Sequence, residues 1–119
     1  MDLVLAVLAV NRHAESHGFG PANLSRVSTA ASELGRNILK YATGGYLLLR
    51  DAQQPGMRGI EIEVRDRGPG IEDLEGALSE NVSTGGTLGL GLPGVRRLMD
   101  EFEISSSPQG TRVTVRKWS

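Results

Sequence analysis

The sequence predicts an α+β protein in which helices cover one face of a mostly antiparallel sheet. Long segments with a helical repeat of apolar residues fill the first third of the chain. Strict alternation of apolar and charged residues follows at 60–66, and two further alternating segments end the chain. Repeats of three and four residues indicate amphipathic helices, and alternation indicates half-buried strands. Helices and sheet bury their apolar faces against each other, which makes a two-layer sandwich with a mixed, mostly antiparallel sheet the expected architecture.

Length and composition favour one domain spanning residues 1–119. The chain is 39% hydrophobic and 23% charged, with a formal net charge of -1, and contains no internal repeat or linker. Because there is no basic excess, we expect no nucleic-acid partner. The absence of cysteine excludes disulfides, thiolate metal sites and a cysteine nucleophile.

Two helices are predicted in the N-terminal third. The first covers residues 2 to about 17 and stops at Gly18. Its apolar opening is shorter than the ~20 residues that cross a bilayer, and it lacks a signal-peptide pattern. We therefore expect a buried helix in a cytoplasmic protein without a membrane partner. The second helix starts at Pro21 and ends at Gly44. Its apolar repeat consists of Leu24, Val27, Ala31, Leu34, Ile38 and Tyr41.

Two strands are predicted next, at 46–52 and 60–66, with 53–59 as a turn or loop between them. In the second strand the alternation places Ile60, Ile62 and Val64 on one face and the intervening charged residues on the other. Continuing that alternation puts Asp66 on the apolar side.

The C-terminal half predicts a short helix at 71–80, a glycine-rich loop at 81–91 and a helix over 93–102 with Pro93 in its first turn. Strands at 101–107 and 111–118, joined by a turn, complete the chain. Phe102 and Trp118 are expected in the core.

Glu33 and Asn37 lie one turn apart at the border of the apolar stripe, where they would face the rim of a pocket. The alternative is a solvated helix edge. Asp66, on the core face at a strand end, needs hydrogen-bond donors to offset lost hydration. The alternative there is an aspartate that opens the turn "DRGPG".

The glycine-rich segment matches two known phosphate loops poorly. "GLGLPG" at 89–94 has the G-x-G-x-x-G spacing, but no strand leads into it and no strand-borne acid follows. A Walker loop is excluded because Gly-Lys-Ser/Thr does not occur. Backbone amides leading into a helix N-terminus, which favour an anion such as phosphate, remain as one interpretation. A plain connector is the other.

Isolated polar residues give weaker indications. Lys40 is suited to reach a phosphate, although an exposed lysine is the ordinary alternative. His13 and His17 share a helix face, but with no third ligand evident we do not expect metal binding. Arg96 and Arg97 are expected at the surface.

Four segments, "ELGRN", "VRDRGPGI", "GLGLPG" and "GTRVTV", occur in the order and spacing of the nucleotide-binding boxes of the GHKL superfamily, which includes gyrase, histidine kinases and MutL. The chain resembles this superfamily over nearly its whole length. Within it, the sequence is most similar to the small serine kinases that regulate bacterial sigma factors, of the RsbT switch-kinase type and the related RsbW anti-sigma type. The resemblance implies a Bergerat ATP-binding fold whose usual N-terminal edge strand is missing here.

The resemblance also implies roles for individual residues. Glu33 would be the general base, and Asn37 would ligate Mg²⁺ on the phosphates of ATP. Asp66 would accept a hydrogen bond from the adenine amino group, with Thr111 beside it. Residues 83–91 would form a lid over the phosphates. The implied nucleotide-binding residues are Asn37, Lys40, Asp66, Gly68, Gly70, Ile71, Ser83, Thr84, Gly85, Gly86, Gly89, Leu90, Gly91 and Thr111.

The function implied by the resemblance is an ATP- and Mg²⁺-dependent serine/threonine protein kinase. Its substrate would be an antagonist protein with a STAS domain, and release after phosphorylation would free the kinase to activate a PP2C-type phosphatase. Two alternatives to this function remain. The first is a non-catalytic module whose partner binding depends on nucleotide, and the second is an anti-sigma kinase of the RsbW type.

Overall fold

The computed structural model describes residues 3–41, 45–67 and 91–119, and for residues 37–41 the backbone alone. The expected short helix at 71–80 and most of the expected glycine-rich loop lie outside the described residues. The helices are α1 (Leu3–Ser16), α2 (Pro21–Tyr41) and α4 (Gly91–Leu98), and the strands are β1 (Gly45–Gln54), β2 (Met57–Asp66), β3 (Glu101–Ser107) and β4 (Gly110–Trp118).

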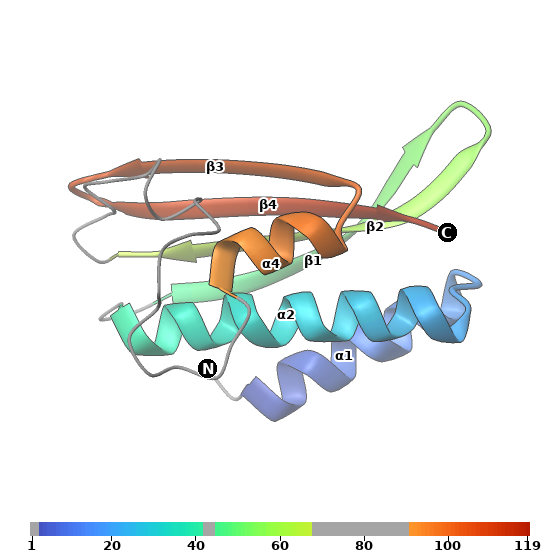
Figure 1. Cartoon of the computed structure of the whole chain (residues 1–119), viewed down its shortest axis with the longest axis horizontal. Helices are drawn as coiled ribbons and strands as arrows, with labels where there is room; N and C mark the ends of the chain where they lie inside the picture. The colour runs from blue at the N-terminus through green and yellow to red at the C-terminus, as the bar shows by residue number, and fades with distance from the viewer. Residues whose placement is uncertain (1–2, 42–44, 68–90) are drawn as a thin grey trace.

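The strands form a sheet in the order β1-β2-β4-β3, and the helices cover one of its faces (Figure 1). This confirms the two-layer α+β sandwich. All the described strand pairs are antiparallel, in agreement with the mostly antiparallel sheet that we expected. Helix α1 is the first element that the structure describes.

The core lies between α2 and the sheet. The predicted faces are confirmed: Ile60 and Ile62 of β2 are fully buried, as are Val27 and Ala31 of α2. Helix α4 adds Val95, and β4 adds Val113 and Val115. The remaining core members are Val10, Ala14, Phe19, Ala30, Leu34, Val64 and Met99.

Helix α1 differs from the expectation of a buried helix. It packs mainly on α2 at the outside of the helical layer, so Val10 and Ala14 are its fully buried residues while Val4 is 69% exposed and Leu5 63%. The helix ends at Ser16, just before the predicted stop at Gly18, whose φ of 81° is favoured by glycine. None of the described helices is long and apolar enough to cross a membrane.

The β1–β2 hairpin is longer than the sequence suggested. Residues 53–59 were expected to form a turn or loop, but pairing continues to Gln54 opposite Met57, leaving only Pro55 and Gly56 between the strands. Residues 53–59 have low β-propensity. The pairing register of β1 and β2 extends both strands into this segment nonetheless. Gly56, at φ 75°, permits the tight turn.

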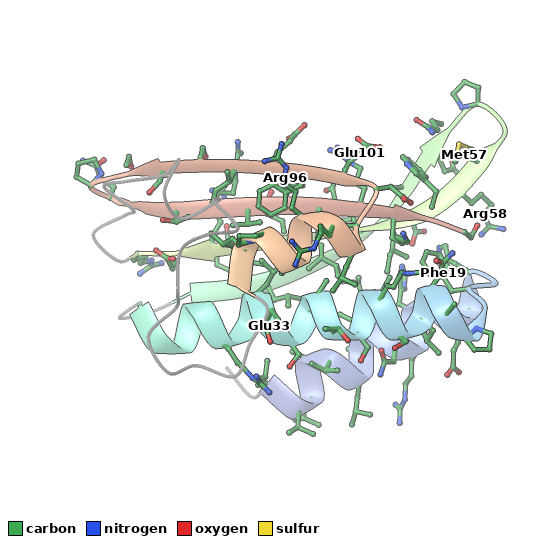
Figure 2. The ribbon with its side chains drawn as sticks, in the orientation of Figure 1. Phe19, Glu33, Met57, Arg58, Arg96 and Glu101 are labelled. Atoms are coloured by element: carbon green, nitrogen blue, oxygen red, sulfur yellow. The ribbon has the colours of Figure 1, made fainter. Side chains whose placement is uncertain are left out.

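Two further expectations are corrected in the C-terminal half. Helix α4 begins at Gly91 and ends at Leu98, not at residue 102, because β3 starts at Glu101 and pairs with β4. Phe102 and Trp118 are half-buried and not in the centre of the core. The Trp118 indole Nε1–H donates to Glu101, a polar partner at 3.0 Å that holds the ring at the sheet surface. Arg96 and Arg97 are exposed, as expected, and Figure 2 shows Arg96 on α4.

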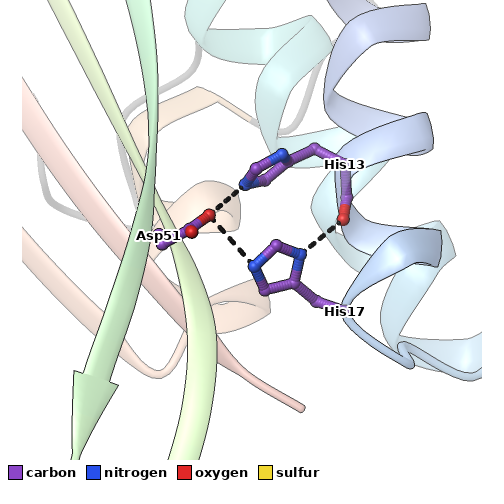
Figure 3. Close-up of side chains that lie close together, drawn as sticks. All are labelled: His13, His17 and Asp51. Carbon is purple, nitrogen blue, oxygen red and sulfur yellow. Dashed lines mark hydrogen bonds and ion pairs between the residues drawn. The ribbon is translucent and has the colours of Figure 1, made fainter.

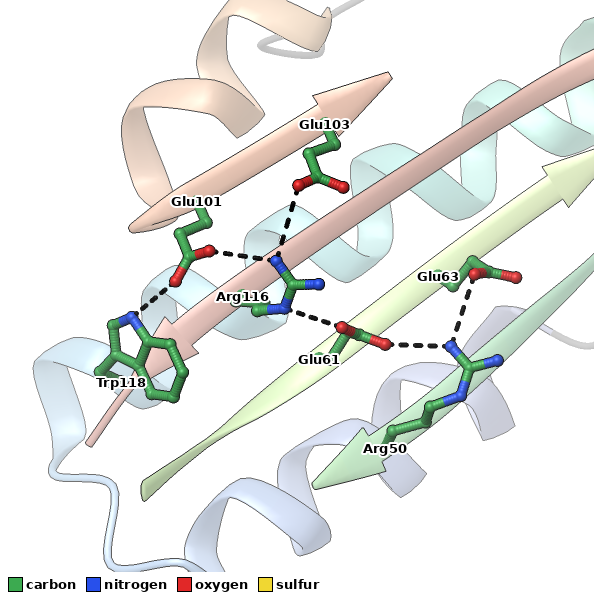
Figure 4. Close-up of polar contacts among 7 residues, drawn as sticks. All are labelled: Arg50, Glu61, Glu63, Glu101, Glu103, Arg116 and Trp118. Carbon is green, nitrogen blue, oxygen red and sulfur yellow. Dashed lines mark hydrogen bonds and ion pairs between the residues drawn. The ribbon is translucent and has the colours of Figure 1, made fainter. Parts of the chain in front are cut away.

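The outer face of the sheet carries a chain of ion pairs (Figure 4). Glu61 lies between two arginines, at 3.0 Å from Arg50 Nη1 and 2.8 Å from Arg116 Nε. Arg116 continues to Glu101 at 3.0 Å, and Arg50 to Glu63 at 3.4 Å. The hydrogen bond with Glu61 raises the pKa of Arg50. These contacts explain how charged residues sit half-buried or buried on this face.

Candidate functional site

Four chain segments that carry predicted site residues converge on one end of the molecule. Figure 1 shows the C-terminal end of α2, the end of β2, the start of β4 and the start of α4 at the same end of the sandwich. The antiparallel pairing of β2 with β4 requires part of this, because the end of β2 then lies beside the start of β4. The convergence therefore follows from topology and involves segments far apart in sequence.

Asp66 and Thr111 are in direct contact at this end. The backbone amide of Thr111 donates to Asp66 Oδ1 at 3.1 Å, across 45 residues of sequence. Asp66 is half-buried, as the alternation along β2 indicated, and this amide is a donor of the kind that such a carboxylate needs. A carboxylate has two oxygens and about four acceptor positions, so its capacity exceeds one hydrogen bond. Asp66 is thus suited to bind an amino group in addition to Thr111.

Thr111 is fixed from its other side as well. It is 8% exposed, and its Oγ1 lies 3.0 Å from Ser106 Oγ on the neighbouring strand β3. A hollow of about 350 Å³ opens around these residues, lined by the end of β2 and the β3–β4 turn. The lining of the hollow therefore includes a carboxylate, three serines and a threonine together with Arg65 and Arg112.

Gly110 is a site residue that the sequence analysis did not select. Its φ is 148°, and a Cβ built on it would lie 2.1 Å from the backbone oxygen of Asp66. Only glycine permits the two strands to approach this closely. The available signal was its position, directly before Thr111 in the turn "PQG".

Glu33 lies on α2 (Figure 2) and is more deeply placed than the pocket rim that we expected. It is 8% exposed, so the alternative of a solvated helix edge is wrong for this residue. The charged partner recorded for it among the described residues is Arg36, whose Nη1 is 3.5 Å from Glu33 Oε1. That contact is long and its arginine is 58% exposed, which makes it weak. Glu33 thus presents a largely buried carboxylate held by one weak ion pair among the described residues.

Of the other predicted residues, Asn37, Lys40 and Gly91 have a described backbone, and the rest do not. Asn37 and Lys40 lie on α2 one and two turns beyond Glu33, and their side chains lie outside the described residues. Gly91 begins α4 with φ 65°, a conformation that favours glycine. The remaining predictions lie outside the described part of the chain: Gly68, Gly70, Ile71, Ser83, Thr84, Gly85, Gly86, Gly89 and Leu90.

Comparison with known proteins defines the class. Residues 2–117 match the family model described as the histidine kinase-like ATPase domain. The chain belongs to this family, which confirms the superfamily resemblance drawn from its four motifs. Membership in a family of ATPase domains implies that the chain binds ATP.

A more specific similarity is to a characterised relative. The chain is 42% identical over 118 residues to the serine/threonine-protein kinase RsbT of Bacillus subtilis (strain 168), a match that covers 98% of this chain and 89% of that protein.

Solved structures support the fold alone. The catalytic domain of the histidine kinase ThkA aligns with a TM-score of 0.62 at 19% identity, covering 98% of this chain and 92% of the other. The mycobacterial sensor histidine kinase MprB aligns with a TM-score of 0.60 at 20% identity, covering 80% and 71%. At these identities the agreement is in architecture: helices packed on one face of an antiparallel sheet.

Proposed function

We propose that this protein is an ATP-dependent serine/threonine protein kinase. The observation that carries the proposal is Glu33, a buried carboxylate one turn before Asn37 on the helix that borders the site. The identity of 42% with a serine/threonine-protein kinase over nearly the whole chain supports the same activity. We further propose that residues 1–119 act as a single ATPase-type domain in the cytoplasm.

The described residues fit a bound nucleotide at its adenine end. Asp66 accepts a hydrogen bond from the adenine amino group, and the backbone amide of Thr111 holds the Asp66 carboxylate in place. Gly68, Gly70 and Ile71 lie next along the chain and pack against the base in this proposal. The segment 83–91, including Ser83, Thr84 and Gly91, covers the phosphates with its backbone amides. Lys40 contributes a positive charge.

Asn37 is the proposed ligand of Mg²⁺. Mg²⁺ prefers oxygen ligands, usually one or two from the protein together with water and substrate phosphates. The amide of Asn37 is neutral, so its oxygen can bind the metal without adding a second negative charge one turn beyond Glu33.

When bound, ATP supplies the phosphoryl group that is transferred from its terminal phosphate to a serine or threonine oxygen of the partner, leaving ADP. Glu33 accepts the proton of that hydroxyl as the new bond to phosphorus forms. Its burial keeps water away, and the adjoining Leu34, 2% exposed, fixes the helix that positions it. General base catalysis of this kind contributes about 10²- to 10⁴-fold in rate. Most of the remaining acceleration comes from positioning and charge neutralisation.

The proposed substrate is an antagonist protein with a STAS domain, as the sigma-factor kinases that this sequence resembles would use. Phosphorylation adds about -1.5 to -2 charges at the docking surface. The added charge repels the kinase, which is then free to bind a second partner, such as a PP2C-type phosphatase. The chain thereby acts as a partner-switching regulator of stress or sigma-factor signalling.

Phosphoryl transfer tests this proposal directly. Wild type, Glu33→Gln and the matched control Glu15→Gln, an exposed glutamate of α1, are incubated with γ-labelled ATP, Mg²⁺ and a STAS-domain antagonist. We expect label on serine or threonine, reduced by about 10²-fold or more in Glu33→Gln and unchanged in Glu15→Gln.

Other outcomes would redirect the assignment. ATP binding with no transfer by any of the three proteins indicates a non-catalytic module that binds its partner in a nucleotide-dependent way. Capture of a sigma factor by the purified chain indicates a kinase of the anti-sigma type. Equal transfer by wild type and Glu33→Gln contradicts the role given to Glu33.

A further inference from the structure

His13 of α1, His17 just after the end of that helix and Asp51 of β1 form a compact cluster (Figure 3). Asp51 Oδ1 lies 2.6 Å from His13 Nε2 and 3.0 Å from His17 Nε2. Potential ligand atoms of the three residues all lie within 4.8 Å of one another. The sequence analysis dismissed metal binding at the two histidines because it found no third ligand, and Asp51 shows that this reason was wrong.

The hydrogen bonds of His17 define which of its nitrogens carries a proton. Its Nδ1 is 2.9 Å from the backbone oxygen of His13. A carbonyl oxygen can only accept, so Nδ1 is the donor. In the neutral ring, Nε2 then carries a lone pair, and that lone pair faces the Asp51 oxygen, which is itself an acceptor.

A metal cation placed here would bind the lone pairs of both groups at once. His13 Nε2 meets the same carboxylate oxygen at 2.6 Å, so one nitrogen of each ring lies against a single oxygen of Asp51.

We propose that His13, His17 and Asp51 form a binding site for a divalent transition metal, with Zn²⁺ as the best match. Zinc is bound by histidine nitrogen at about 2.0–2.1 Å and by aspartate oxygen at about 2.0–2.2 Å, and sites with three protein ligands complete their shell with water. The bond from His17 Nδ1–H to a backbone carbonyl is the outer contact that zinc-binding histidines commonly make.

The burial of the three residues suits this role. The side chain of His17 is 9% exposed and that of His13 30%, so both rings are largely enclosed, while Asp51 is 63% exposed. Tetrahedral ligands at zinc distances are about 3.3 Å apart. The observed contacts must therefore widen by several tenths of an ångström, and the exposed Asp51 side chain has room to do so.

The proposed metal site is separate from the nucleotide site. Asp51 is six residues along β1 from Gly45, which pairs with Asp66, a separation of about 20 Å at the rise of an extended strand. A metal ion here would tie the outermost helix α1 to the edge strand β1. Its binding is thus testable without nucleotide and independently of kinase activity.

The test uses the full chain after treatment with a chelator and dialysis. Zn²⁺ is titrated calorimetrically into wild type, His17→Gln, Asp51→Asn and the control Glu103→Gln, an exposed glutamate of β3 whose side chain is 68% exposed. Wild type and the control are expected to bind one equivalent, with a rise of several degrees in Tm. Each ligand variant should bind at least about 10-fold more weakly. Mg²⁺ at the same concentration should have no effect at this site, because it prefers oxygen ligands.

Co²⁺ provides a second measurement that does not depend on the variants folding. Wild type loaded with Co²⁺ should show visible absorption bands of a low-coordinate nitrogen and oxygen site, removed by one equivalent of Zn²⁺. Absence of stoichiometric Zn²⁺ binding, or equal affinity in Asp51→Asn, would overturn the proposal. Either result would identify the cluster as a hydrogen-bonded contact between the two histidines and β1.

Discussion

Gly110 and Asp66 show how a single backbone position can define a binding site. The close approach of Gly110 to the Asp66 backbone oxygen puts the following amide, that of Thr111, on the Asp66 carboxylate. The position of the carboxylate thus depends on a residue with no side chain. Substitutions at Gly110 should therefore affect nucleotide binding and stability together.

We expect Gly110→Ala to lose most of its affinity for ATP and to unfold more readily. The added Cβ would overlap the Asp66 oxygen at 2.1 Å, and φ 148° disfavours a side chain. The combined cost is at least about 2 kcal/mol in the free energy of unfolding. Urea unfolding and titration with a fluorescent ATP analogue measure the two effects.

Gly20→Ala is the matched control for that substitution. A Cβ at Gly20 meets nothing within 4 Å, and its φ lies outside the disfavoured region. Its unfolding free energy should change by less than about 0.5 kcal/mol. Equal behaviour of the two variants would show that the Gly110 contact does not hold the site.

At this scale the sequence predicted some residues well and others not at all. The alternation along β2 indicated that Asp66 would face inward and need a donor, and the donor is present. Asp51 could not be assigned to the two histidines, because 34 or more residues separate it from them and its contact depends on how β1 lies against α1. Glu33 is more buried than its place at the edge of an apolar stripe suggested, because both α1 and α4 pack against α2.

At the scale of elements, the sheet has one apolar face and one charged face. Glu61 and Glu63, which alternate with inward residues of β2, pair with arginines on neighbouring strands. The sequence predicted the alternation, but could not give the cross-strand partners, which depend on register. For the same reason it missed the outer half of the hairpin, where register and not propensity extends the strands.

Glu61→Gln should lower the free energy of unfolding by about 1–2 kcal/mol, because the Glu61 carboxylate is 16% exposed and accepts hydrogen bonds from two arginines. Part of the loss should disappear in high salt, which screens the remaining charges. Glu103→Gln is the control, since its carboxylate is 68% exposed and 3.8 Å from Arg116. Its loss should be below about 0.5 kcal/mol. Similar urea midpoints for the two variants would show that Glu61 does not link the strands.

For the whole molecule, the two-layer arrangement followed from the sequence because it depends on periodicity, which is a local property. The convergence of α2, β2, β4 and α4 at one end could be inferred only through resemblance, since it depends on strand order. The same strand order places the histidine cluster of α1 toward the other end of β1. The fold therefore separates a nucleotide site from a proposed metal site along one sheet.

The central claim is that the end of β2, the start of β4 and the α2 segment around Glu33 bind one nucleotide. Backbone amide NMR during titration with ATP and Mg²⁺ tests it most directly. The amides of Asp66, Thr111 and Glu33 should shift with a single common Kd, while those of Asp51 and Gly56 remain in place. Shifts confined to one of the segments, or different Kd values for β2 and α2, would contradict the account.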